Sequence, residues 1–420
     1  MSKNLRRTKK GSETRLKLQN IGQIKEADIK FGDLTVLVGP QATGKSVFLQ
    51  LFRLVLDRRY IHQQYQRLNQ SWEDGKTFLR YYLGEGMEES WVELPAGGGS
   101  YLAFNGRRYD LENLADTKGR PRENTSPRAF YVPAHRAFAL YWNWPILVLN
   151  FIQTHSFVLW DFIGQLALLL GRALKLKEEP LGRFAKPFRE VLQSDIFSGF
   201  DLRISKSQGS ERLVLQRGRQ KPIPFLGWST GQREVVPLLL ALSWLLPRGG
   251  TTRRQSFEWV IIEEPEMGLH PKAISDVLLI VLDLLERGYR VCISTHSFVV
   301  LALVWALNNI KENKGDANDV LNLFEAQKEQ QVLQKEQQVL KIAQSALEKE
   351  YKVYYFEPDE KGMVTVKDIS RLDPFSEDYW GGLGKFSTNA CEVVAGVVTR
   401  SYTRSESDQV VALHVREKSE

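Results

Sequence analysis

The chain is poor in cysteine: among its 420 residues only Cys292 and Cys391 are cysteines. Two thiols so far apart in sequence indicate neither a disulfide framework nor a cysteine-based zinc site, and they suit a reducing compartment. The first residues also lack the apolar core of a signal peptide, and polar side chains interrupt the most hydrophobic region, residues 145–170. We therefore expect a cytoplasmic protein without a membrane span.

Other absences narrow the function. The chain has no histidine-rich nuclease or metal motif and no Toprim-like acid cluster, which argues against a nuclease site in the chain itself. With 43% hydrophobic and 25% charged residues the composition is globular, and the formal net charge is +7. A basic tail over residues 1–13 suits a polyanion such as nucleic acid, and a merely solvated tail explains it equally well.

The segment from Gly39 to Ser46 fits the G-x4-G-K-[ST] phosphate-binding pattern. An apolar, β-branched run over residues 34–38 precedes it, and residues 47–56 have the pattern of a buried helix. Inward-pointing backbone N–H groups and the helix N-terminus would hold phosphates, with Lys45 on the β- and γ-phosphates and Ser46 on Mg²⁺. The predicted cofactor-binding residues of this loop are Gly39, Pro40, Gln41, Ala42, Thr43, Gly44, Lys45, Ser46 and Val47.

A second candidate strand, residues 257–262, ends in carboxylates. In a doubly wound sheet the carboxyl ends of the strands line the ligand crevice. We therefore expect Glu263 to join Ser46 as a metal ligand, and Glu264 to act as general base on the attacking water. An acidic loop that simply ends a strand is the alternative.

Two further segments stand where nucleotide contacts are expected. The strand over residues 290–295 leads into His296, which suits a γ-phosphate sensor and catalytic neighbour of Glu264, while a structural or solvated histidine is the alternative. Ser229 and Gly231 open a helix, so a hydroxyl and backbone N–H groups could face a phosphate, with Gln232 beside them. An ordinary capping box is the alternative there.

Together these segments resemble the motifs of the ABC-type ATPase superfamily. They occur in family order and are similar to Walker A (39–46), the signature (229–233), Walker B (261–264), the D-loop (265–271) and the switch histidine (His296). Glu-Glu-Pro-Glu, Leu-His-Pro and the opening residues 16–32 resemble the soluble branch. That branch contains overcoming-lysogenisation-defect nucleases, RecF-like proteins and ATPases of the anti-phage systems Septu and PARIS.

The resemblance implies an α/β fold: an ABC-type P-loop head with a mixed central sheet, an antiparallel edge sheet and a helical insertion. It implies ATP and Mg²⁺ as cofactors and a composite site, in which Ser229 and Gly231 complete the site of a second subunit. ATP would then hold two heads together head to tail, as a dimer or a higher even-numbered oligomer.

Departures from the family pattern also carry information. The signature reads Ser-Thr-Gly-Gln, and Glu263 stands where transporters usually have Asp, which argues against a transporter subunit. We find no clear Q-loop, although residues 130–136 resemble a Pro-Ala-x-Arg segment of the soluble branch. Arg136 is accordingly a candidate contact to nucleotide or partner, with a surface arginine as the alternative.

A duplicated heptad covers residues 328–341 and aligns Leu333, Leu340 and Leu347. It could pair with a second subunit, fold against its own head, or form a solvated helix, and it is too short for a Rad50-like or SMC-like coiled coil. The expected divisions are a basic tail (1–13), the head's N-terminal part (14–136), a helical insertion (137–200), the head's C-terminal part (201–310), a heptad helix (311–350) and a C-terminal α/β extension (351–420).

The sequence thus predicts an ATP-hydrolysing switch that controls a partner effector, with a nuclease in anti-phage defence as the expected class and nucleic acid as a possible trigger. This last step depends on resemblance alone. A RecF-like ATPase of DNA repair or maintenance is the rival interpretation, and a transporter energising subunit is the third.

Overall fold

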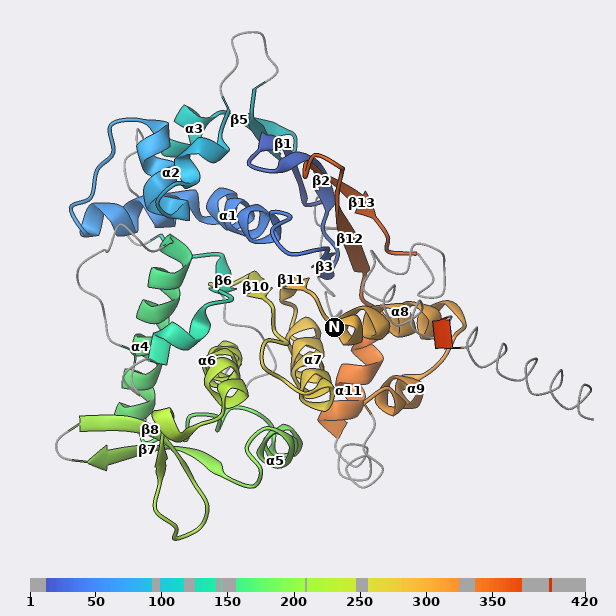
Figure 1. Cartoon of the computed structure of the whole chain (residues 1–420). Coiled ribbons are helices and arrows are strands. Elements are labelled where there is room, and N and C mark those ends of the chain that lie inside the picture. Colours follow the sequence, from blue (N-terminus) through green and yellow to red (C-terminus); the bar gives the residue numbers. More distant parts are fainter. Residues whose placement is uncertain are drawn as a thin grey trace, which may run out of the picture. The chain divides into compact units, whose positions relative to one another are not determined.

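The computed structural model describes residues 13–92, 99–116, 125–140, 145, 156–207, 210–246, 256–324, 337–371 and 393–394. The chain divides into two compact units, residues 1–371 and 372–420. The elements below all belong to the first unit (Figure 1).

A ten-stranded mixed sheet forms the centre of this unit, in the order β5-β4-β1-β2-β13-β12-β3-β11-β10-β6. The strands β12, β3, β11, β10 and β6 run parallel, whereas β2, β1, β4 and β5 form an antiparallel edge. This arrangement confirms the predicted fold class. The strands are β1 (Arg15–Ile21), β2 (Ile24–Lys30), β3 (Leu34–Val38), β4 (Tyr101–Phe104), β5 (Arg107–Tyr109), β6 (Ala129–Val132), β10 (Trp259–Glu263), β11 (Arg290–Thr295), β12 (Tyr351–Pro358) and β13 (Val364–Asp368).

Helices cover both faces of the parallel strands, with α1 on one side and α7 on the other (Figure 1). The strands β3 and β10 are therefore buried along their whole length, which explains why they are continuous apolar runs. The helices are α1 (Lys45–Arg67), α2 (Gly75–Leu83), α3 (Leu111–Ala115), α4 (Phe157–Leu176), α5 (Lys186–Asp195), α6 (Thr230–Leu245), α7 (Pro271–Glu286), α8 (Phe298–Glu312), α9 (Ala317–Asn322) and α11 (Gln337–Ala346).

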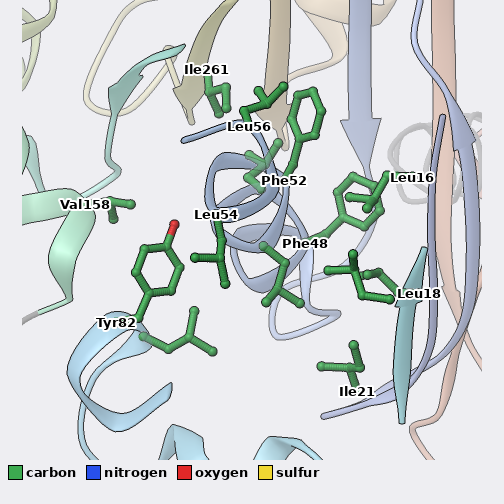
Figure 2. Close-up of a cluster of buried hydrophobic side chains, with 14 of the residues drawn as sticks. Leu16, Leu18, Ile21, Phe48, Phe52, Leu54, Leu56, Tyr82, Val158 and Ile261 are labelled. Carbon is green, nitrogen blue, oxygen red and sulfur yellow. The ribbon is translucent and has the colours of Figure 1, made fainter. Parts of the chain in front are cut away.

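The core under α1 is rich in aromatic side chains. Phe48, Phe52 and Leu54 of α1 point toward β1, β10 and α2 (Figure 2). Phe52 stacks on Phe31 at 4.1 Å between ring centroids and meets the edge of Trp259 at 4.9 Å. Such pairs add to the stabilisation that comes from burying apolar area.

A buried ionic cluster joins α1 to α4 and β6. Arg53, which has no exposed surface, pairs with Asp57 at 2.6 Å and with Asp161 of α4 at 3.1 Å. The Asp57 carboxylate also accepts the backbone N–H groups of Arg128 and Ala129 at the start of β6. This cluster fixes the middle of α1 against α4 and β6.

The expected insertion, residues 137–200, contains α4 and α5. After it comes a small antiparallel sheet of β7 (Asp201–Ser207), β8 (Ser210–Gln216) and β9 (Ile223–Pro224). Strands β7 and β8 pair as an antiparallel hairpin. Helix α4 is long and apolar enough to cross a membrane by length and composition. More than half of its apolar window is buried, with Phe157 and Phe162 in the core, and core helices of soluble proteins pass the same test. Trp142, Trp144 and Phe151, which precede α4, lie outside the described residues.

The C-terminal part of the unit differs from the expected divisions. Strand β12 pairs with β3 and β13 pairs with β2, so residues 351–368 belong to the head's own sheet rather than to a separate extension. Helix α11 packs its buried residues Val339, Ile342 and Ala343 on the head, and Lys341 pairs with Glu286 of α7. Its described part is therefore folded against its own head, while Leu333 lies outside the described residues.

Candidate nucleotide-binding and hydrolysis site

The predicted motifs meet at one edge of the sheet. Strands β3, β11, β10 and β6 are parallel neighbours, so their carboxyl ends lie side by side. The phosphate loop follows β3, Glu263 ends β10, and His296 follows β11. Loops at these strand ends form the ligand crevice in open α/β sheets.

The phosphate loop has the backbone that its sequence predicts. Gly44 is the N-cap of α1 with φ 85°, and no side chain caps the helix. The first N–H groups of α1 thus have no side-chain acceptor, and such groups favour an anion. Glycine is also required sterically at Gly39 (φ 152°), because a Cβ there would lie 2.7 Å from the carbonyl oxygen of Phe356 in β12.

Lys45 is buried among neutral oxygens. Its Nζ donates to the carbonyls of Gly39 at 2.9 Å and Pro40 at 2.7 Å, and to Thr43 Oγ1 at 3.3 Å. Burial lowers the pKa of Lys45 to about 8, although the carboxylates of Glu264 and Glu266 oppose this shift. A negatively charged group beside Nζ would raise this pKa back toward its ordinary value.

Glu263 lies beside Ser46, as expected of two ligands of one metal ion. Ser46 Oγ donates to Glu263 Oε2 at 3.3 Å. Tyr131 of β6 donates its hydroxyl to Oε1, and the Ala134 N–H lies 3.3 Å from Oε2. Burial raises the pKa of Glu263, while these three hydrogen bonds lower it. Sequence reasoning missed Tyr131, because nothing in an apolar strand distinguishes a tyrosine that orients a carboxylate 132 residues away.

Glu264 and His296 face each other across 3.7 Å, measured from Glu264 Oε1 to His296 Nε2, and both are about 30% exposed. Glu264 adopts φ 43°, in the left-handed region, and its N–H donates to the carbonyl of Ser294. Burial lowers the pKa of His296, and Lys45 lowers it further. Glu266 Oε1 accepts the hydroxyl of Thr295 at 2.8 Å and the N–H of His296 at 2.6 Å, a role that the Glu-Glu-Pro-Glu motif could have suggested.

Arg136 is neither a surface arginine nor a nucleotide contact of the kind expected. It has no exposed surface, and its guanidinium donates to the carbonyls of Glu234, Glu263 and Glu264 at 2.9–3.0 Å. The local sequence, residues 129–140, does not indicate that Arg136 is buried and bound to carbonyls. All three acceptors lie about a hundred residues or more further along the chain.

The signature residues form the N-terminus of α6. Ser229 and Gln232 cap the helix reciprocally, so the capping box that the sequence offered as an alternative is present. Ser229 and Thr230 are exposed. Gly231 lies against the D-loop, where a Cβ would stand 2.3 Å from the carbonyl of Gly268. Within the described residues, no hydrogen bond or ion pair joins Ser229, Gly231 or Gln232 to the phosphate loop.

The residues at this edge fit ATP and Mg²⁺. Lys45 is a buried cation with neutral partners, and Ser46 and Glu263 place two oxygen ligands together. Mg²⁺ typically takes one or two such ligands from the protein and the rest from phosphates and water.

Two comparisons of sequence relate parts of this chain to known proteins. Residues 146–302 match the family described as "AAA domain, putative AbiEii toxin, Type IV TA system". The Old nuclease of Escherichia phage P2 is 31% identical over 127 residues, which are 30% of this chain and 20% of that protein. The chain therefore matches only a fifth of that relative's length.

Solved structures give weaker likenesses. An SmcHead bound to the C-winged helix domain of ScpA has a TM-score of 0.43 at 11% identity, and the match covers 85% of this chain and 97% of that one. The SMC head domain from Thermotoga maritima has a TM-score of 0.34 at 11% identity, covering 86% and 99%. Both TM-scores are below 0.5, so we draw nothing from either. By its motif order, the geometry of its strand ends and these sequence matches, the chain is similar to ABC-type P-loop ATPase domains.

Proposed function

We propose that the chain binds ATP with Mg²⁺ and hydrolyses it, and that this cycle controls a partner effector. The observation that carries the proposal is the pair of buried, oppositely charged groups at one strand edge, Lys45 and Glu263, whose hydrogen-bond partners are all neutral. A phosphate would neutralise the first and a divalent cation the second. ATP with Mg²⁺ supplies both.

The chemistry follows from the positions of the side chains. Lys45 and the N–H groups of α1 hold the β- and γ-phosphates, and Ser46 and Glu263 hold Mg²⁺, which would neutralise charge on the leaving phosphate. Glu264 accepts a proton from the water that attacks the γ-phosphorus as the bond to the β-γ bridging oxygen breaks. His296, 3.7 Å from Glu264, is placed to contact the γ-phosphate or that water.

A composite site requires a second copy of the chain. Ser229 is exposed at the N-terminus of α6, where its hydroxyl and the helix N–H groups can meet a phosphate of another molecule. Two apolar side chains close to the signature and to His296 in sequence support self-association: Leu226 is 77% exposed and Phe298 is 48% exposed. We infer that ATP joins two heads and that hydrolysis releases them.

The effector is inferred from the relative. The match to this chain covers only 20% of the Old nuclease, so most of that protein lies outside the match. We infer that this chain supplies the ATPase switch and that a separate protein, a nuclease, supplies the effector in anti-phage defence. Tight, salt-sensitive DNA binding by the isolated chain would instead favour an ATPase of DNA maintenance.

The test is the release of phosphate from ATP, measured beside nucleotide affinity. Lys45→Ala should abolish both binding and turnover, because it removes the cation. Glu264→Gln should bind ATP normally and hydrolyse it about 10²- to 10⁴-fold more slowly, because only the base is lost. Glu360→Gln, at an exposed turn, is the matched control and should behave as wild type. Equal losses of affinity in the Lys45 and Glu264 variants would contradict the assigned roles.

A further inference from the structure

Two contacts fasten the loop that carries Glu264 to the helix that carries the signature. In the first, Arg136 donates from Nη1 to the Glu263 carbonyl, from Nη2 to the Glu264 carbonyl and from Nε to the Glu234 carbonyl. In the second, Gly231 of α6 packs directly on Gly268 of the D-loop. The post-β10 loop and the start of α6 are therefore joined on both sides of Glu264.

Only arginine can make the first contact. The three acceptors lie on two elements, and the guanidinium reaches them with three donors held in one rigid plane, whereas a lysine ammonium is a single point. Arg136 is fully buried, which lowers its pKa, and the neighbouring carboxylates of Glu234 and Glu266 partly offset that cost. An interior cation held by backbone carbonyls fixes the path of the main chain.

The main chain at Glu264 needs to be held. Its φ of 43° is a left-handed conformation that is strained for a non-glycine residue. Such a conformation persists only where the surroundings enforce it. Arg136 holds the Glu264 carbonyl, and the carbonyl of Ser294 holds its N–H. These two bonds set the direction in which the Glu264 side chain leaves the backbone, toward His296.

We propose that Arg136 is a positioning residue: it holds Glu264 in place and makes that placement depend on the signature helix α6. The inference deepens the proposed function and rests on it. When Ser229 engages the nucleotide of a second copy, any shift of α6 reaches the same chain's Glu264 through the guanidinium and through the Gly231–Gly268 contact. Engagement of one site thereby tunes hydrolysis at the other.

The experiment compares Arg136→Lys with Arg290→Lys. Arg290 is a half-buried arginine that also donates to backbone carbonyls, those of Phe31 and Gly32, but it lies at the opposite, N-terminal end of the parallel strands. For Arg136→Lys we expect ATP affinity within about twofold of wild type and kcat lower by on the order of 10- to 100-fold, because misplacement of a catalytic group by about 1 Å has this effect. For Arg290→Lys we expect a lower unfolding midpoint with kcat per folded molecule unchanged.

Turnover of Arg136→Lys at the wild-type rate, or a parallel loss of affinity and kcat, would overturn the inference, since the arginine would then be only a structural strut. If Arg136→Lys does not fold, Gly268→Ala decides, because it disturbs the second contact while the Arg136 side chain stays in place. The same split between affinity and kcat supports the inference, and an unchanged kcat overturns it. Absence of hydrolysis by the wild type would instead refute the proposed function.

Discussion

The two ends of the parallel strands both bury charged side chains, but they compensate those charges differently. At the amino end of β6, Arg53 meets Asp57 and Asp161 in ion pairs of 2.6 and 3.1 Å. At the carboxyl ends, the hydrogen-bond partners of Lys45 and Glu263 are backbone groups and hydroxyls. At the amino end the opposite charges pair with one another. At the carboxyl ends Lys45 and Glu263 have only neutral hydrogen-bond partners, as the proposed binding of a charged ligand requires.

The way in which buried charges are compensated therefore distinguishes a structural cluster from a candidate functional site. A charged cluster that is complete within the chain serves the fold, because removing one member leaves another uncompensated. The carboxyl end carries two further signs of function: the left-handed Glu264 and the lowered pKa of Lys45. Strained backbone and shifted pKa values concentrate at functional sites.

The largest expected effect, on the free energy of unfolding, tests the difference between the two ends directly. Arg53→Met should lower the free energy of unfolding by about 3–5 kcal/mol, because it leaves the buried carboxylates of Asp57 and Asp161 unpaired. Lys45→Met, which removes a buried cation without an ionic partner, should leave the free energy of unfolding within about 1 kcal/mol of wild type or raise it, while abolishing ATP binding. Urea titration beside nucleotide binding measures both quantities.

The surface pair of Arg15 with Asp28 provides the control, since Arg15→Met should cost less than about 1 kcal/mol. If Lys45→Met destabilises the protein as much as Arg53→Met does, Lys45 serves the fold, and the distinction between the two ends is wrong.

A second, smaller effect uses pH. His62, in the half of α1 far from the phosphate loop, is 7% exposed between the rings of Trp72 and Phe78, and burial lowers its pKa to about 4. Because the unfolded chain binds the proton more tightly than the folded one, stability is full above the ordinary pKa of 6.5 and falls as pH decreases toward 4. Between pH 7 and pH 5 the loss should be about 2 kcal/mol.

Unfolding by urea at the two pH values measures this loss. His62→Phe should remove that part of the pH dependence, whereas His135→Gln, at an exposed position, should retain it. An unchanged pH dependence in His62→Phe would show that other groups cause the acid sensitivity.

The sequence predicts the fold class and the site where local pattern carries the information. The loop before α1, the carboxylates that end β10 and His296 after β11 each follow a short apolar strand, so their meeting at one edge could be inferred. Contacts between distant segments could not. Nothing local shows that Arg136 reaches carbonyls beyond residue 233, that Tyr131 orients Glu263, or that β12 lies beside the phosphate loop. The sequence cannot distinguish the two roles of Ser229, helix cap and phosphate contact, because one hydroxyl can serve both.

The smallest effect on stability separates these two roles of Ser229. Ser229→Ala removes the cap of α6 and should cost about 1 kcal/mol, whereas Ser229→Asp keeps a capping oxygen and should stay within about 0.5 kcal/mol of wild type. A carboxylate facing a triphosphate repels it, so Ser229→Asp should block ATP-driven pairing. Light scattering in the Glu264→Gln background, with ATP and Mg²⁺, measures the mass of the paired or unpaired protein.

The control is Asp74→Ala, which removes the cap of α2. It should cost about 1 kcal/mol and leave pairing intact. If Ser229→Asp still pairs on addition of ATP, Ser229 only caps its helix, and the composite site is refuted.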